Sequence, residues 1–309
     1  MEFQHVSVLL DECINGLDIK PDGIYVDGTA GGAGHSKAIA QKLDGGKGGR
    51  LIAIDRDPDA VKVAKERLEG LPAEVVKGNY SQIDSILEDL GIEKVNGILL
   101  DLGVSSFQLD NAGRGFSYHT DAPLDMRMSR EGISARDVVN SYSSEELAKI
   151  IFEYGEERHA RRIAAGIVKA REHKPVETTM ELAEIIKSCV PQRARREKNP
   201  CKKTFQAIRI EVNSELDHLS IALDKAFDSL GQGGRLCIIS FHSLEDRLVK
   251  QRFKTFCTGC TCPPDFPVCI CGKKPRGKMI TGKPIEAGER ELAENNRSRS
   301  AKLRIIEKL

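Results

Sequence analysis

Short apolar runs alternate with amphipathic segments through the first hundred residues of the chain. Four of these runs have the length of buried strands: 24–26, 50–55, 73–76 and 97–101. Between them, 59–69 and 81–90 carry apolar residues at helical spacing, and Gly91 marks the end of a helix. Because strands that alternate with helices form parallel sheets, we predict an α/β domain with a doubly wound, mostly parallel sheet.

The alternation breaks after the fourth predicted strand. Residues 102–130 are rich in Gly, Ser and Asp, a composition typical of a functional loop. Ser143 with Glu146, and Thr178 with Glu181, match the capping box that starts a helix. The segments that follow lack a strand pattern and are predicted to be helices at 144–152, 156–171 and 179–190.

The pattern of the α/β domain resumes near residue 204. Apolar residues at helical spacing predict one long helix over 204–230, which the glycines of 231–234 end. A fifth strand, a helix and a final edge strand are predicted at 235–240, 243–256 and 301–308. We therefore expect an α/β domain in two parts, 1–105 and 204–309, with an all-helical insertion at 106–203.

A cluster of glycines follows the first predicted strand. After Asp27 the chain has glycines at 28, 31, 32 and 34, and a helical segment begins at Ser36. Glycines let a backbone approach a ligand closely, and the first N–H groups of a helix point back toward such a loop. Lys37 stands where the dinucleotide fingerprint requires its third glycine. The stretch resembles instead the first motif of S-adenosylmethionine methyltransferases, and a simple strand-to-helix turn is the alternative.

Aspartates close three of the predicted strands, at Asp27, Asp55 and Asp101. In doubly wound sheets, ligands bind at the edge formed by the carboxyl ends of the strands. Asp55 closes the second strand, where an acidic residue accepts hydrogen bonds from ribose hydroxyls. A helix cap explains any one of these aspartates equally well, but three on one edge indicate a ligand site.

Composition and charge narrow the class of protein. The chain has 309 residues, of which 40% are hydrophobic and 30% charged, as in ordinary globular proteins. It shows neither a signal peptide nor an apolar run of membrane-spanning length, so we expect a cytoplasmic protein without a membrane partner. The net charge is only +1, but positive charge gathers near 193–203, 273–283 and 297–304. Such runs are solvated surface or phosphate-binding sites.

Nine cysteines in a chain without a secretion signal favour reduced thiols or a metal site over disulfides. Five of them form the pattern Cys257-x-x-Cys260-x-Cys262 with Cys269-x-Cys271. Two Cys-x-Cys pairs can supply four thiolates to a structural zinc ion, which makes candidate ligands of Cys260, Cys262, Cys269 and Cys271. The spacing differs from the usual Cys-x-x-Cys pairs, so free thiols are the alternative. Cys189 and Cys237 lie in apolar runs and are expected in the core.

Eight segments, in order along nearly the whole chain, resemble those of the RsmH (MraW) family. They are HVSVLL at 5–10, DGTAGGAGHS at 27–36, DRDP at 55–58, DLGVSSFQLD at 101–110, RGFSY at 114–118, DMRM at 125–128, TFQAIRIEVNSEL at 204–216 and SFHSLEDR at 240–247. The resemblance implies a class I S-adenosylmethionine-dependent methyltransferase fold, Rossmann-like, whose helical insertion recognises the substrate. It also implies methylation of N4 of a cytidine in the decoding region of bacterial 16S ribosomal RNA, within the small ribosomal subunit.

Carried over to this sequence, the resemblance implies a set of cofactor contacts. They are Ala33, Gly34, His35, Asp55, Tyr80, Asp101 and Gln108. Backbone N–H groups at 33–35 are expected to meet the methionine carboxylate, and the Tyr80 ring to face adenine. RNA contacts are expected from Arg193, Arg195, Arg196, Lys202 and Lys203. Lys273, Lys274, Arg276, Arg297 and Arg299 are expected to assist them.

Asp101 is the candidate catalytic residue. Amino-group methyltransferases carry an acidic or amide residue at this strand end before Pro-Pro-aromatic, but here Leu102-Gly-Val follows. From its position at the strand end, we expect Asp101 near the reacting methyl group. We expect the target base to be unstacked beside Phe107 or Phe241. The missing Pro-Pro-aromatic motif disfavours the alternative of a DNA amino-methyltransferase. The glycine loop with its aspartates disfavours the other alternative, a non-catalytic RNA-binding assembly protein.

Overall fold

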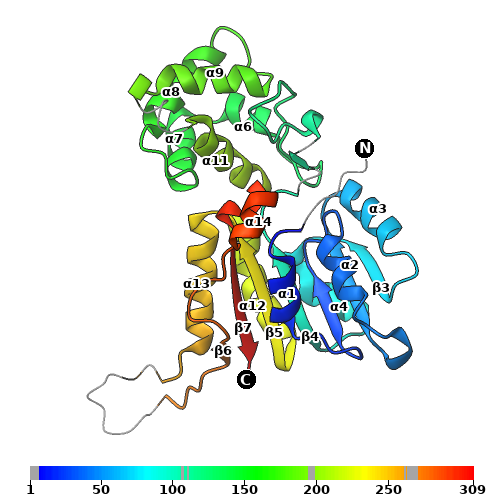
Figure 1. The fold of residues 1–309 in the computed structure, drawn as a ribbon. Coiled ribbons are helices and arrows are strands. Elements are labelled where there is room, and N and C mark those ends of the chain that lie inside the picture. Colours follow the sequence, from blue (N-terminus) through cyan, green and yellow to red (C-terminus); the bar gives the residue numbers. More distant parts are fainter. Residues whose placement is uncertain (1–6, 106–107, 110, 194–198, 261, 263–270) are drawn as a thin grey trace. The chain divides into compact units, whose positions relative to one another are not determined.

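The computed structural model describes residues 7–105, 108–109, 111–193, 199–260, 262 and 271–309. The chain forms two compact units, which Figure 1 shows in ribbon form. We call residues 1–103 with 216–309 the sheet unit, and residues 104–215 the helical unit. Within the described part of the chain, no helix has the length and apolar character needed to cross a membrane.

The sheet unit is built on a seven-stranded sheet with the order β3-β2-β1-β4-β5-β7-β6. Its strands are β1 (Ile24–Asp27), β2 (Arg50–Asp55), β3 (Ala73–Lys77), β4 (Val95–Asp101), β5 (Leu230–Ser240), β6 (Gly277–Met279) and β7 (Lys302–Lys308). The first five strands run parallel, and β7 pairs antiparallel with both β5 and β6. The predicted doubly wound, mostly parallel sheet is confirmed. The prediction that the last strand lies at the edge is wrong, because the short β6 covers β7.

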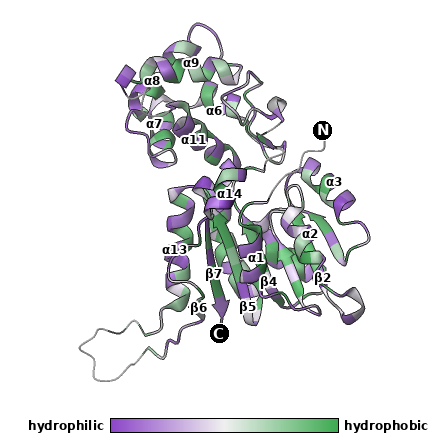
Figure 2. Ribbon diagram, in the orientation of Figure 1, coloured by the Kyte–Doolittle hydropathy of each residue, from purple (hydrophilic) through white to green (hydrophobic). Residues whose placement is uncertain are grey.

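Helices cover both faces of the sheet, which gives three layers. Along β2, Leu51 and Ala53 pack into one buried cluster while Ile52 and Ile54 pack into the other, as the period of a strand requires. The first cluster includes residues of α1 (Leu10–Leu17), α2 (Gly34–Ala40) and α3 (Pro58–Arg67). The second includes residues of α4 (Ile83–Asp89), α12 (Glu215–Ser229) and α13 (Ser243–Cys257). Figure 2 shows the hydrophobic residues concentrated along the strands between these layers.

The helical unit contains α6 (Ala135–Ser141), α7 (Ser144–Glu153), α8 (Ala160–Arg171), α9 (Thr179–Cys189) and α11 (Cys201–Asn213). These helices enclose a core of their own, in which Leu147, Ile163 and Leu182 are fully buried. Both predicted capping boxes are confirmed, at the starts of α7 and α9. The unit therefore has the hydrophobic core that an independent domain needs.

The single long helix predicted over 204–230 is wrong. Ser214 has a φ of 48°, which ends α11 and separates it from α12. Phe205 and Ile208 of α11 pack into the core of the helical unit, whereas Leu219 and Leu223 of α12 pack against the sheet. The helical unit accordingly extends to residue 215, and not to the predicted residue 203.

Hydrogen bonds of Asn213 and Arg114 join three of the eight segments that carry the family resemblance. The Asn213 side-chain amide donates to the Met126 carbonyl at 2.8 Å and accepts from the Met128 N–H at 2.8 Å. Arg114 donates to the carbonyls of Arg127 and Met128 at 2.8 and 3.0 Å. The segments at 114–118, 125–128 and 204–216 therefore form one hydrogen-bonded base of the helical unit.

Candidate active site at the carboxyl edge of the sheet

Three aspartates lie at the same edge of the sheet, as predicted. Asp27, Asp55 and Asp101 are the last residues of β1, β2 and β4. These strands are neighbours and run parallel, with Asp27 level with Ala53 on one side and Leu99 on the other. The carboxyl groups differ in what they bind, and this difference assigns their roles.

Asp27 is committed to the protein itself. Its side chain is almost fully buried, and Oδ2 accepts a hydrogen bond of 2.6 Å from the Ser36 hydroxyl. Its Oδ1 accepts from the N–H of Thr29 at 3.1 Å. Asp27 therefore holds the glycine loop against the start of α2, and it supports the site without facing a ligand.

The glycine loop adopts a compact turn between β1 and α2. Gly31 and Ala33 both have left-handed backbones, with φ of 49° and 60°. The Ala33 N–H donates to the Ala30 carbonyl at 2.6 Å, so this predicted cofactor contact is engaged within the loop. At Gly34 a β-carbon would lie 2.0 Å from the Ser7 hydroxyl oxygen. A side chain at 34 would therefore force the Ser7 hydroxyl to move.

Asp55 combines two internal hydrogen bonds with remaining acceptor capacity. Its Oδ2 accepts from the Gly31 N–H at 2.7 Å, and its Oδ1 accepts from the Asp57 N–H at 2.8 Å. Each carboxylate oxygen has two lone-pair directions, so one on each oxygen remains for a ligand. Burial raises the pKa of Asp55 to about 6, against the lowering effect of these two N–H groups.

Asp101 lies beside His35 at the end of β4. The His35 Nδ1 is 3.6 Å from the Asp101 Oδ2, and its Nε2 lies 2.9 Å from the Val8 carbonyl oxygen. A carbonyl only accepts, so Nε2 carries a proton, and Nδ1 is the ring nitrogen that faces Asp101. Burial raises the pKa of Asp101 well above its usual value, and the charges of Asp27 and Glu245 raise it further.

The other oxygen of Asp101, Oδ1, is shielded from solvent and has no hydrogen-bond partner among the described residues. A buried acceptor left unpaired costs about 1–3 kcal/mol, which proteins rarely tolerate away from functional sites. Asp101 therefore has a whole oxygen available to an incoming hydrogen-bond donor, whereas each oxygen of Asp55 already accepts one hydrogen bond.

Thr29 is a part of the site that the sequence analysis missed. Its hydroxyl oxygen accepts from the Asp101 N–H at 2.6 Å and lies 3.4 Å from the Asp27 Oδ1. Thr29 thus fixes the end of β4 to the glycine loop. Its position two residues after a strand-ending aspartate, where such side chains form local turns, was the available signal.

Comparison with known proteins now identifies the family. The sequence profile of the MraW methylase family matches residues 2–309. The chain belongs to the MraW methylase family. A protein of Lachnospira eligens named Ribosomal RNA small subunit methyltransferase H is 58% identical over 313 residues, covering 100% of this chain and 99% of that protein. A protein of the same name from Clostridium botulinum strain Kyoto is 57% identical over 311 residues, covering all of both chains.

Membership in the MraW family confirms the recognised resemblance and makes the chain a methyltransferase. Two predicted cofactor residues of this methylase lie in different units. Tyr80 begins the 3₁₀ turn Tyr80–Gln82 after β3, and a β-carbon on Gly28 would lie 3.1 Å from the Tyr80 Cβ. Gln108 belongs to the helical unit, where its Oε1 accepts from the Ser105 N–H at 3.0 Å. Tyr80 therefore adjoins the glycine loop, while Gln108 closes a local turn.

The basic residues of the helical unit are only partly described. Arg193, Lys202 and Lys203 are exposed, and Lys203 Nζ donates to the Glu156 carbonyl at 2.6 Å. The predicted contacts Arg195 and Arg196 lie outside the described residues, as does Phe107.

The basic residues of the sheet unit form two groups, at opposite ends of its strands. The strand β7 begins level with Ser240, at the edge that carries Asp101, so Arg297 and Arg299 lie near that edge just before β7. Both are exposed around the buried Ser298. Gly277 of β6 pairs with Lys308 at the other edge, which places Lys273, Lys274 and Arg276 there.

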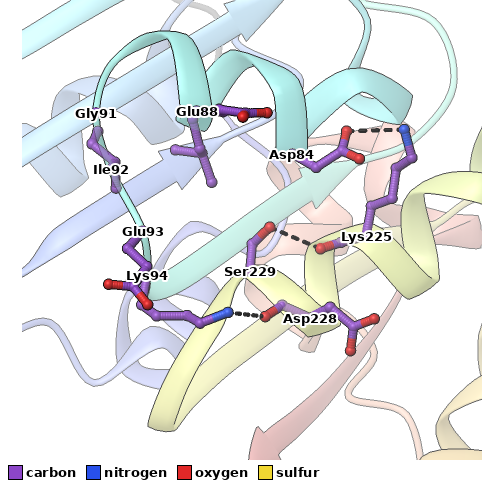
Figure 3. Close-up of a pocket in the computed structure, with 10 residues that line it drawn as sticks. Asp84, Glu88, Gly91, Ile92, Glu93, Lys94, Lys225, Asp228 and Ser229 are labelled. Atoms are coloured by element: carbon purple, nitrogen blue, oxygen red, sulfur yellow. Dashed lines mark hydrogen bonds and ion pairs between the residues drawn. The ribbon is translucent and has the colours of Figure 1, made fainter.

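Arg276 has a structural role at that opposite edge. Its guanidinium pairs with Asp228 and lies 5.3 Å from the centre of the Phe227 ring. A shallow pocket of about 510 Å³ lies at this edge too, between the loop before β4 and the end of α12 (Figure 3). An ion pair between Asp84 and Lys225 crosses it at 2.9 Å. The pocket therefore lies at the opposite end of the strands from Asp27, Asp55 and Asp101.

The cysteines divide as the sequence predicted between core and cluster. Cys189 and Cys237 are buried, which confirms the expectation that they are core residues. The sulfurs of Cys260, Cys262 and Cys271 lie within 4.8 Å of one another. Cys269, the fourth predicted zinc ligand, lies outside the described residues.

Proposed function

We propose that this chain transfers a methyl group from S-adenosylmethionine to the exocyclic N4 of a cytidine in the decoding region of 16S ribosomal RNA. The observation that carries the proposal is the shielded Oδ1 of Asp101 at the carboxyl edge of the sheet, which has no hydrogen-bond partner within the part of the chain that the structure describes. An amino group is a donor with two protons, and such an acceptor suits it. Relatives at 57–58% identity are named as small-subunit ribosomal RNA methyltransferases, which supports RNA as the source of the amino group.

The carboxyl edge suits S-adenosylmethionine as the methyl donor. Asp55 ends β2, where an acidic residue binds ribose hydroxyls in this fold, and it keeps acceptor capacity on both oxygens. Tyr80, next to the glycine loop, offers a ring face for adenine. Gly34 and His35 start α2 beside the loop, where backbone N–H groups are suited to a carboxylate. The donor supplies an electrophilic methyl on a positively charged sulfonium, and the acidic edge complements that charge.

Asp101 is proposed to accept the proton that the amino group must lose. The lone pair of cytosine N4 is delocalised into the ring, so N4 is a weak nucleophile that depends on position and hydrogen bonding. As the bond between N4 and the methyl carbon forms and the bond from that carbon to sulfur breaks, one N4 proton passes to Asp101 Oδ1. His35 Nδ1, at 3.6 Å from Oδ2, is placed to take up that proton from the carboxyl group.

The half-buried Phe241 is proposed to receive the unstacked base. It directly follows Ser240, the last residue of β5, so it lies at the same edge as Asp101. A β-carbon on Gly103 would lie 3.8 Å from the Phe241 ring, which places the ring beside the loop that leaves β4. An aromatic ring here offers a flipped cytosine a stacking surface.

Arg297 and Arg299 are proposed to bind RNA phosphates, together with Arg193, Lys202 and Lys203 of the helical unit. The double variant Arg297→Ala/Arg299→Ala is expected to weaken RNA binding about tenfold at physiological salt, since each cation neutralises about one phosphate. The slope of binding against salt should fall by about two counterions. Filter binding of 16S RNA over a series of salt concentrations measures both quantities.

Lys273→Ala/Lys274→Ala is the matched control, because it removes the same charge from the opposite edge of the sheet. RNA affinity and its salt dependence should stay within about twofold of the parent protein. Equal losses in the two double variants would show that position relative to Asp101 does not matter, and would contradict the proposed surface.

The proposed substrate is tested by supplying labelled S-adenosylmethionine with three acceptors: small ribosomal subunits that lack the modification, free 16S RNA and duplex DNA. Label is expected in ribosomal RNA and not in DNA. Transfer to DNA alone would indicate an amino-methyltransferase of DNA. Retention of the donor without transfer to any acceptor would indicate a binding protein.

A further inference from the structure

The sheet unit carries a cluster of thiols that the methyl-transfer chemistry does not use. We propose that Cys260, Cys262 and Cys271 bind a structural zinc ion. The proposal rests on the arrangement of these three described sulfurs and is independent of the proposed substrate.

The separation of the Cys260 and Cys271 sulfurs matches tetrahedral zinc. Zinc–sulfur bonds of about 2.3 Å in a tetrahedral site place the sulfurs about 3.8 Å apart. The sulfurs of Cys260 and Cys271 are 3.7 Å apart, and all three lie within 4.8 Å of one another. The separation of 3.7 Å is far longer than the 2.05 Å of a disulfide. The three thiols thus form a group of metal-binding size.

The local backbone supports thiolates at these positions. The Cys262 N–H donates to the Cys260 sulfur at 3.4 Å, and such bonds stabilise a metal-bound thiolate. Gly272 follows Cys271 with a φ of 61°, a conformation that turns the chain directly after the ligand. Lys273 and Lys274 come next in the chain, so positive charge lies close in sequence to the three thiols.

The position of the cluster in the fold favours a structural role. Cys260 and Cys262 follow the end of α13, whereas Cys271 precedes β6. The two arms already meet at their base, where the Arg276 N–H donates to the Phe256 carbonyl at 2.8 Å. Because β6 begins at the edge opposite Asp101, the ion would fasten these arms together without touching the reacting groups.

Metal analysis of the full-length protein, purified without chelator, tests the site. We expect about one zinc ion per chain, and at least about tenfold less in Cys260→Ser, Cys262→Ser and Cys271→Ser. Replacement of zinc by cobalt should give the intense visible absorption of a tetrahedral thiolate site. This absorption should be lost in the same variants.

Cys257→Ser is the matched control. Cys257 lies three residues before Cys260, at the end of α13, and interacts with the backbone of Met279. Zinc content in this variant should equal that of the parent. A metal-free parent protein, or one with a disulfide between Cys260 and Cys271, would overturn the proposal. Retention of zinc in all three serine variants would overturn it as well.

Discussion

Asp101→Asn is expected to lower the rate of methyl transfer by about a hundredfold to ten-thousandfold, the usual contribution of a positioned proton acceptor. Asparagine has nearly the same shape, but its amide accepts no proton at neutral pH and turns donors toward the amine. Donor affinity should change much less than turnover, because the proposed role of Asp101 concerns the amino group. Single-turnover transfer and donor titration measure these two effects separately.

The pH profile provides a second test of Asp101. Burial holds the pKa of this carboxyl well above its usual value, so lowering the pH protonates it and removes the acceptor. The rate of methyl transfer should therefore rise with pH as Asp101 loses its proton. This pH dependence should be absent in Asp101→Asn. Asp84→Asn, the same substitution at the opposite edge, should leave the rate unchanged. A rate for Asp101→Asn within about threefold of the parent would contradict the proposed role.

Asp55→Asn is expected to weaken binding of S-adenosylmethionine by about tenfold to a hundredfold. Hydrogen bonds to a charged group contribute about 1.5–3 kcal/mol, and the substitution removes the charge. The NH2 group of the new asparagine also lies against the backbone N–H of either Gly31 or Asp57, where two hydrogen-bond donors meet without an acceptor. Isothermal titration measures the loss, and thermal unfolding of the unbound protein shows how much of it reflects a disturbed loop.

The pH dependence of S-adenosylmethionine binding separates the loss of a ligand contact from a disturbance of the loop. Since the pKa of Asp55 is about 6, the group is protonated below that pH and donor affinity should rise as the pH passes through it. The free energy of unfolding of the protein without S-adenosylmethionine should change with pH in the opposite direction. The folded pKa exceeds the ordinary value of 3.8, so the free energy of unfolding falls as the pH rises from about 4 through about 6. A donor affinity that is flat between pH 5 and about 7 would contradict a ribose contact at Asp55.

Local patterns were sufficient to predict much of the sheet unit. The strand at 50–55 was predicted with its observed bounds, and the strand predicted at 97–101 has its observed end but begins two residues earlier, at Val95, because buried parallel strands are continuous apolar runs. Asp55 and Asp101 follow from these strand ends, and Asp27 from the end of β1. The position of β7 did not follow, because nothing in the periodicity of 301–308 indicates that β6, only three residues long, pairs outside it. Strand order is a property of long-range pairing.

The break at Ser214 shows a second limit of periodicity. Apolar spacing continues across it, since α11 and α12 are both helices, but each buries its apolar face in a different unit. Contacts in the site between residues far apart in the sequence could not be predicted from periodicity either. The hydrogen bond from His35 to the Val8 carbonyl, which directs the ring toward Asp101, depends on how residues 27 positions apart meet. The hydroxyls of Thr29 and Ser36 were local signals that were available and not used.

The central claim is most directly tested by identifying the methylated nucleoside. Small ribosomal subunits lacking the modification are incubated with the protein and labelled S-adenosylmethionine, and the RNA is then digested to nucleosides for mass analysis. The account predicts label in N4-methylcytidine at one position of the decoding region, and its loss with Asp101→Asn. Label on a ring carbon or on a ribose 2′-hydroxyl would contradict an amino-group acceptor, and with it the role given to Asp101.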